Sequence, residues 1–123
     1  MEKIFESEYR FLCVIWEHEP VSSPRLVELC GLELGWKKST TYTVLRKLAE
    51  KGMVQNENTI VTSLVSKEQV DRQASDELLE RTAGGDVPRF LAAFLKDRKL
   101  TQKEIQKIRE LIEEARPEDV SQQ

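Results

Sequence analysis

The side chains best suited to specific chemistry lie between Trp36 and Gly52, where hydroxyl, aromatic and cationic groups recur at helical spacing. Placing residues at steps of about 100° gives one largely apolar side and one polar side. The apolar side carries Thr41, Val44, Leu45 and Leu48. The candidate contact residues on and beside the polar side are Lys37, Lys38, Ser39, Thr40, Tyr42, Thr43, Arg46 and Lys47.

These polar side chains match the groups that a DNA duplex displays. An arginine can bond bidentately to guanine, hydroxyls can reach phosphates or base edges, and the threonine methyl can touch thymine. We expect Thr40, Thr43 and Arg46 to read bases. We expect the other five candidates, three of them lysines, mainly to position phosphates. The competing interpretation is an ordinary solvated helix face. The elements predicted around this helix distinguish that interpretation from a DNA-contacting face.

The charge distribution is compatible with a nucleic-acid partner although the whole chain carries a net charge of −3. Between Trp36 and Gly52, five Lys and Arg side chains stand against Glu50 alone, a local charge of +4 that leaves −7 on the remaining residues. Such an acidic remainder would suppress loose, sequence-independent association.

The elements predicted before and after this helix form a winged helix-turn-helix in a mainly α chain. Ser7 can cap a helix that runs to about Glu17, and Pro20 ends that segment. Ser22 or Ser23 can cap a second helix, closed by Gly31 or Gly35. The third helix begins at Lys38 or Ser39, with Gly52 just past its end. Met53–Gln55 and Thr59–Val65 are β-prone, and Asn56–Asn58 is a plausible turn between them.

Three further helices are predicted after the hairpin. They begin at the capping box of Ser66 and Gln69, at Asp86 with Pro88, and at the capping box of Thr101 and Glu104. The last two carry an apolar stripe made of Phe90, Leu91, Phe94, Leu95, Ile105, Ile108, Leu111 and Ile112. A stripe of this size is uncommon on a monomer surface, so we expect a homodimer joined through this C-terminal helical dimerisation region. The alternative is that these helices pack back on the N-terminal domain.

The composition narrows the other possibilities. The chain lacks an apolar run long enough to span a membrane and the pattern of a signal peptide, which favours a soluble, cytoplasmic protein without a membrane partner. Cys13 and Cys30 are most simply core thiols, although a redox or metal role stays open. His18 alone gives no basis for a zinc site, and we expect neither metal nor cofactor. We also expect no enzymatic activity, since no catalytic triad or phosphate-binding glycine loop is present.

Three blocks of residues occur together in the first 70 positions. The first block contains Ile4, Glu6, Ser7, Glu8, Tyr9, Leu12, Ile15, Trp16 and Glu17; the second contains Trp36, Thr40, Thr43, Leu45, Leu48, Lys51 and Gly52; the third is Leu64 to Glu68. Together these blocks resemble the penicillinase-repressor family. The resemblance implies a cytoplasmic bacterial repressor that binds palindromic operators in double-stranded DNA as a winged-helix homodimer.

The resemblance also identifies departures. Release from DNA by a sensor protease system in one branch involves cleavage at an Asn-Phe pair, where this chain has Ala93-Phe94, and the terminal cysteines of the copper-sensing branch are missing. The wing tip, residues 56–59, lacks the usual basic residue. Lys47 stands where the family has arginine, a more directional donor. The inducing signal therefore stays open between proteolysis, a ligand and a partner.

We expect a DNA-binding domain at residues 1–66 and a helical dimerisation domain at residues 67–123, with a frayed polar tail from Pro117 onward. The predicted function is a sequence-specific transcriptional repressor. The alternative is a winged-helix protein-interaction module that has lost DNA binding, which the acidic wing and the net charge favour.

Overall fold

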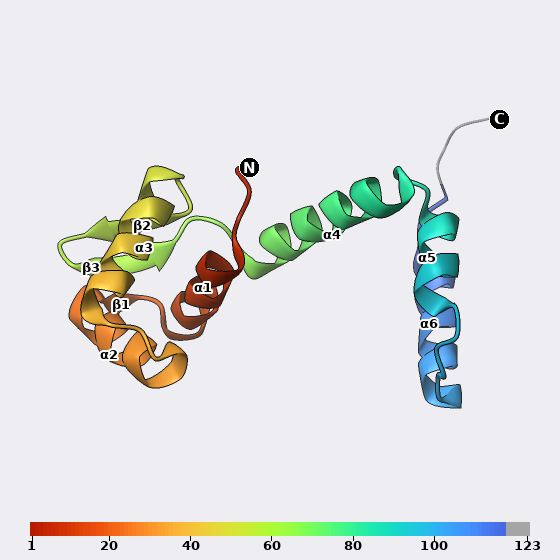
Figure 1. Ribbon diagram of the computed structural model, residues 1–123, viewed down its shortest axis with the longest axis horizontal. Helices are drawn as coiled ribbons and strands as arrows, with labels where there is room; N and C mark the ends of the chain where they lie inside the picture. Colours follow the sequence, from red (N-terminus) through yellow and green to blue (C-terminus); the bar gives the residue numbers. More distant parts are fainter. Residues whose placement is uncertain (118–123) are drawn as a thin grey trace.

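The computed structural model describes residues 1–117, so the predicted polar tail lies outside the described residues from residue 118 onward. The elements along the chain are α1 (Glu6–His18), β1 (Val21–Ser22), α2 (Ser23–Leu34), α3 (Lys38–Glu50), β2 (Val54–Glu57), β3 (Ile60–Ser63), α4 (Lys67–Ala83), α5 (Val87–Leu95) and α6 (Gln102–Glu114). Figure 1 shows α1–α3 gathered around the small sheet, and α4 leading away from them to α5 and α6. This arrangement confirms the mainly α winged helix-turn-helix fold.

Most helix ends follow the predicted capping residues. The Ser22 hydroxyl accepts a hydrogen bond from the Arg25 N–H, and complete capping boxes begin α4 at Ser66 and α6 at Thr101. Gly35 ends α2 with a φ of 70°. The predicted Ser7 cap was wrong, because the N-cap lies two residues earlier, at Phe5, where the Glu8 carboxylate accepts the Phe5 N–H.

The sheet is larger than the predicted hairpin. β3 pairs antiparallel with β2 and also with β1, which the sequence analysis missed because two residues carry no alternation pattern. Glu57 pairs with Ile60, so the turn consists of Asn58 and Thr59, with φ values of 52° and 66°. The predicted turn at 56–58 was therefore placed too early, and Thr59 belongs to the turn instead of the strand.

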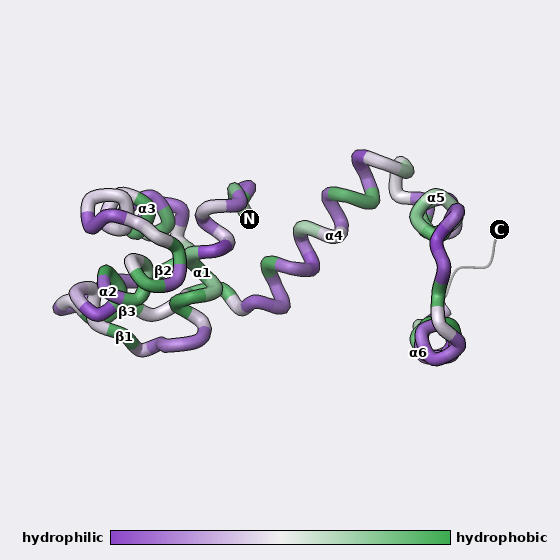
Figure 2. The backbone as a smooth tube through the Cα atoms, turned by 60° about the horizontal axis from the view of Figure 1, so that its bottom comes forward, coloured by the Kyte–Doolittle hydropathy of each residue, from purple (hydrophilic) through white to green (hydrophobic). Residues whose placement is uncertain are grey.

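The core lies in the N-terminal domain, where α1, α2, α3 and the sheet meet. Its fully buried members include Phe11, Leu12, Ile15, Leu26, Leu48, Met53, Val54 and Val61. Both tryptophans pack against this core: the Trp36 ring stacks on Phe11, and the Trp16 Nε1–H donates to the Val65 carbonyl at 2.9 Å. Figure 2 shows the corresponding concentration of hydrophobic segments within this domain.

Cys30 is expected to resist alkylation at pH 8 until the protein unfolds. Its side chain is fully buried, and this burial raises the pKa of the thiol to about 11, so little thiolate is present. Cys13 is half-buried and should react first. Mass spectrometry after iodoacetamide treatment, with and without denaturant, measures both positions. Equal labelling of the two native thiols would contradict this core placement.

The C-terminal arm, defined as α5 and α6, lies away from the core. Neither of its helices buries a side chain within the described part of the chain. Figure 2 views both helices nearly end-on and shows them apart, joined by the segment that follows α5. Among residues 1–117, no helix combines the length and apolar character that a membrane crossing requires.

Candidate nucleic-acid interface

The inner side of α3 is anchored in the core by the residues that the periodicity predicted. Thr41, Val44, Leu45 and Leu48 are all buried. The Thr41 hydroxyl donates to the Lys37 carbonyl at 3.2 Å, so this buried oxygen is satisfied within the helix. Gly52 follows with a φ of 76°, which lets the chain turn directly into β2. The helix is therefore fixed in rotation, and its outer side is determined.

The outer side of α3 carries most of the predicted contact residues. The exposed ones are Lys37, Lys38, Ser39, Thr40, Arg46 and Lys47. Thr43 is half-buried, and Tyr42 is half-buried with its ring packed against the core. The structure thus brings the eight residues together along one helix, but Tyr42 has less freedom than the others to reach a ligand.

The N-terminus of α3 differs from those of α2, α4, α5 and α6. Each of those four helices has a capping hydroxyl or carboxylate, whereas α3 has no side-chain cap among residues 1–117. Helix geometry leaves the N–H groups of Lys38, Ser39 and Thr40 without intrahelical partners. These N–H groups, with the exposed ammonium groups of Lys37 and Lys38, offer donors and positive charge to an anion such as phosphate.

This arrangement has a cost for the isolated protein. A cation near the positive end of a helix dipole is unfavourable by about 0.3–1 kcal/mol, and α3 has no acidic residue in its first turn. Lys37 and Lys38 therefore oppose helix stability where a capping residue would favour it. Sequence reasoning identified the two lysines but missed the uncapped N–H groups. Either Lys38 or Ser39 could begin the helix, so the residue at the N-cap position was not determined.

Lys51 does not belong to the outer surface, although the sequence analysis counted it in the local charge. Its ammonium group lies 2.8 Å from the Glu8 carboxylate, and it also donates to the Lys3 carbonyl at 3.0 Å. The Glu8 and Lys51 side chains are 5% and 17% exposed. The free basic groups of α3 and its N-cap are thus four against Glu50, a charge of +3 and not +4.

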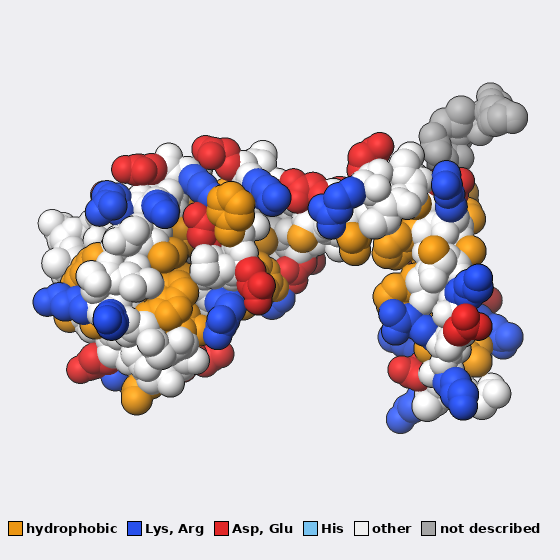
Figure 3. All heavy atoms as spheres, viewed as in Figure 1, with side chains coloured by type: hydrophobic (Ala, Val, Ile, Leu, Met, Phe, Trp, Pro, Cys, Tyr) orange, Lys and Arg blue, Asp and Glu red, His pale blue; other side chains and the backbone are white. Residues whose placement is uncertain are grey.

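The wing is formed by β2, β3 and their turn. Gln55, Asn56, Glu57, Asn58 and Thr59 are all exposed, and none of them is basic. Gln55 donates to the Glu57 carboxylate at 2.6 Å across the outer surface of β2. Figure 3 shows basic side chains spread over the visible face of the N-terminal domain, with acidic side chains among them. The wing tip adds no basic residue to this surface.

A polar cluster of Tyr9, Lys67 and Asp71 ties the start of α4 to α1. The Tyr9 hydroxyl donates to Asp71 at 2.8 Å, and Lys67 donates to both partners at 2.8 and 2.7 Å. Its hydrogen bond to Asp71 raises the pKa of Lys67, and the same bond lowers the pKa of Asp71. The first turn of α4 is therefore held against the N-terminal domain at neutral pH, when both charges are present.

The predicted dimerisation residues lie on the C-terminal arm. Phe90, Leu91, Leu95, Ile105 and Ile108 are half-buried, while Phe94, Leu111 and Ile112 are 47%, 54% and 58% exposed. Phe90 and Phe94 stack on one another with ring centroids 6.0 Å apart. Figure 3 shows hydrophobic side chains reaching the surface along this arm. The residues share one arm but do not form a closed core within the described chain.

Comparison with known proteins identifies the family of this chain. The family model described as penicillinase repressor matches residues 4–114. The penicillinase repressor of Bacillus licheniformis is 22% identical over 116 residues, which cover 91% of each chain. An uncharacterised 16.5 kDa protein of Latilactobacillus sakei is 25% identical over 114 residues, covering 89% of this chain and 78% of that protein. A solution structure of the DNA-binding domain of the repressor BlaI aligns with a TM-score of 0.47 and 23% identity, over 55% of this chain and 90% of that domain.

Proposed function

Since the chain belongs to the penicillinase repressor family, we propose that it is a DNA-binding transcriptional repressor that acts as a homodimer on a palindromic operator. Family membership supports a role as a regulator, and we propose that the chain has no enzymatic activity. The observation that carries the proposal from the family to this chain is the outer side of α3: an uncapped helix start with two lysines, followed by Arg46 and Lys47. The proposed site of action is the cytoplasm, where bacterial DNA lies.

The proposed roles follow from position along α3. Lys37, Lys38 and Ser39 surround the free N–H groups at the helix start and would bind a phosphate. Thr40, Thr43 and Arg46 would reach base edges in the major groove. Lys47 would bind a phosphate at the far end, and Tyr42, held against the core, would contact the backbone only through its ring edge or hydroxyl.

The C-terminal arm supports the proposed homodimer. Its helices bury no side chain within residues 1–117, so a second copy would cover apolar surface that one chain leaves open to water. A two-fold dimer presents two α3 helices to two half-sites, which is why we propose a palindrome. We also keep as proposals the domain division after residue 66 and release from DNA by an inducer, for which a sensor protease is one candidate.

Arg46→Ala and Lys38→Ala are expected to weaken DNA binding in different ways. Losing Arg46 should raise Kd by roughly 5- to 150-fold on the preferred sequence, about 1–3 kcal/mol, and relax one base position. Losing Lys38 should weaken all sequences alike and reduce the salt slope by about one counterion. Fluorescence anisotropy across a salt series, on matched and substituted duplexes, measures both effects.

Lys103→Ala is the matched control for those variants. Lys103 is exposed on α6, so its replacement removes one positive charge at a site distant from α3. Equal losses for Arg46→Ala and Lys38→Ala on every duplex would show that the proposed division between base and phosphate contacts is wrong.

Lys37→Ser is expected to make the protein more stable and the DNA complex weaker. A serine at this N-cap can accept a hydrogen bond from the first turn, which should raise the free energy of unfolding by about 0.5–2 kcal/mol. The same change removes one phosphate contact and should reduce the salt slope by about one. Denaturant unfolding and anisotropy measure the two effects on one sample. Higher stability with unchanged DNA affinity would remove Lys37 from the interface.

A protein-interaction module is the second candidate function. The exposed acidic and amidic wing favours it, because that surface suits a basic protein segment better than a phosphate. This candidate predicts that changes in the wing, such as Glu57→Lys, matter more than changes in α3. The repressor hypothesis predicts that changes in α3 matter more than changes in the wing.

A further inference from the structure

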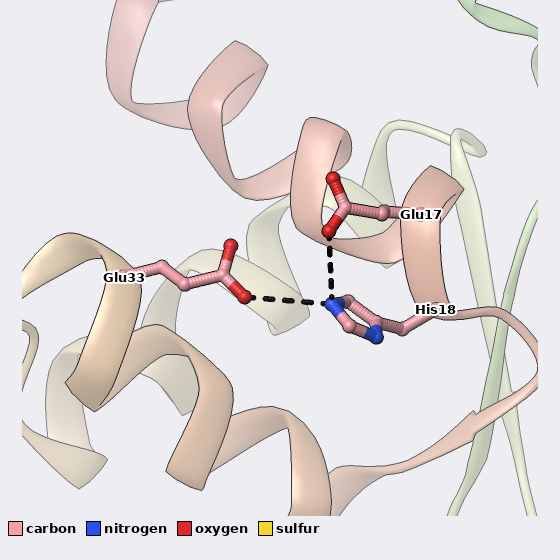
Figure 4. A group of neighbouring side chains, drawn as sticks. All are labelled: Glu17, His18 and Glu33. Atoms are coloured by element: carbon pink, nitrogen blue, oxygen red, sulfur yellow. Dashed lines mark ion pairs between the residues drawn. The ribbon is translucent and has the colours of Figure 1, made fainter.

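The end of α1 and the end of α2 bring three potential metal ligands together. Glu17 and His18 come from the last turn of α1, and Glu33 comes from the last turn of α2. One donor atom from each residue lies within 4.8 Å of the other two. Figure 4 shows both carboxylates directed at the same imidazole nitrogen, Nε2 of His18. This convergence depends on the fold, because Glu33 lies 15 positions beyond His18 in the sequence.

The His18 Nε2 atom is inaccessible to solvent and has no hydrogen-bond partner among residues 1–117. It lies 3.4 Å from a Glu17 oxygen and 3.4 Å from a Glu33 oxygen. Hydrogen bonds between nitrogen and oxygen usually measure about 2.7–3.2 Å, so both contacts are longer than a good hydrogen bond. A buried polar atom usually has a partner, which for this 31% exposed side chain is either a water molecule or a cation.

Two of the three donor separations agree with those expected around a tetrahedral zinc ion. Imidazole nitrogen and carboxylate oxygen bind Zn²⁺ at about 2.0–2.1 Å, so neighbouring ligand atoms in a tetrahedron lie about 3.3–3.4 Å apart. Both separations from Nε2 match this value, whereas the two carboxylate oxygens lie within 4.8 Å of one another, a wider bound than a tetrahedron sets. Two carboxylates and a neutral imidazole together carry a charge of −2, which a divalent cation balances.

A cavity of about 240 Å³ lies beside the two carboxylates. Its lining includes Glu17 and Glu33 together with Cys13, Tyr9 and the basic Arg10, but not His18. A cation in this cavity would meet the carboxylates first, and Arg10 lines the same cavity as a competing positive charge. Cys13 lines the cavity but is not one of the three converging donors, so a thiolate site is the competing arrangement.

We propose that Glu17, His18 and Glu33 form a structural site for a first-row divalent transition cation, with Zn²⁺ as the best fit. The ion would join the last turn of α1 to the last turn of α2, immediately before Gly35 and α3. It would thereby stabilise the relative position of the helices that support α3. This inference does not depend on DNA binding, because its evidence and its readouts concern the N-terminal domain alone.

The test uses the full chain without an affinity tag, first treated with a chelator and then titrated with Zn²⁺ by calorimetry. We expect one Zn²⁺ per chain and a rise in Tm on the order of 10 °C when Zn²⁺ exceeds its Kd about a hundredfold. Glu33→Gln and His18→Gln should each raise the Kd at least tenfold. Glu28→Gln, an exposed carboxylate on the same helix, and Cys13→Ser should leave it unchanged.

Three results would overturn the proposal. One is the absence of Zn²⁺ binding by the wild-type chain. Another is unchanged Zn²⁺ affinity in Glu33→Gln, whose side chain is 41% exposed and whose loss should leave the fold intact. The third is loss of binding in Cys13→Ser alone, which would assign the ion to the thiol.

Discussion

Glu8→Ala is expected to lower the free energy of unfolding by about 3–5 kcal/mol. The change leaves the Lys51 ammonium group without its carboxylate partner, in a place where the lysine side chain is only 17% exposed. It also removes the acceptor of the Phe5 N–H at the start of α1. Denaturant unfolding followed by circular dichroism measures the loss.

The double variant Glu8→Leu with Lys51→Met distinguishes two causes of the expected destabilisation, namely the broken ion pair and the lost side-chain volume. Replacing both charges of a buried pair with apolar groups is often neutral or stabilising, so this variant should recover most of the lost stability. A loss below about 1 kcal/mol in Glu8→Ala would mean that the pair behaves as a surface salt bridge. The positive charge of Lys51 would then have to be counted with the basic surface of α3.

Leu111→Asp combined with Ile112→Asp is expected to convert the proposed dimer into monomers and to reduce operator affinity by about 10²- to 10⁴-fold. Both side chains are more than half exposed in one chain, so the monomer fold should tolerate the change. In the dimer the two carboxylates would be desolvated without partners. A monomer also loses the gain in effective concentration that links two half-sites.

Gln102→Asp combined with Gln106→Asp is the matched control for the dimer variant. It adds the same two negative charges to exposed positions of the same helix, outside the apolar stripe. Sedimentation velocity and anisotropy on one DNA duplex compare the two variants. If the two variants sediment with the same size and bind the DNA duplex with equal affinity, the apolar stripe on α6 does not join two copies of the chain.

The sequence was sufficient for elements that have strong local signals. The 3.6-residue periodicity of α3 identified its buried side, and the capping boxes at Ser66 and Thr101 identified the starts of α4 and α6. Each of these signals depends on residues within four positions of one another. Local physics therefore determined helix existence, helix rotation and most helix starts.

Features that depend on distant residues were missed. Lys51 looked like an outward cation because its partner, Glu8, lies 43 positions earlier and joins it only after α1 packs beside α3. β1 was missed because its two residues become a strand only by pairing with β3. The cluster around His18 was missed for the same reason, since Glu33 reaches it from another helix.

The turn of the wing shows a different limit. Asn58 adopts a φ of 52°, which asparagine tolerates well, but Thr59 adopts 66°, which a β-branched residue disfavours. Propensity therefore placed Thr59 in the strand. The pairing of Glu57 with Ile60 left a two-residue turn, and strand register decided the conformation of Thr59 against its local preference.

The central claim is that the outer side of α3 reads DNA, and selection of bound duplexes from a random pool tests it most directly. The repressor account predicts that the wild-type chain enriches a palindrome whose half-sites lie about one helical turn, or a multiple of it, apart. Arg46→Ala should then enrich the same palindrome with one symmetric pair of positions relaxed. A wild-type chain that enriches no sequence above the starting pool would contradict the account.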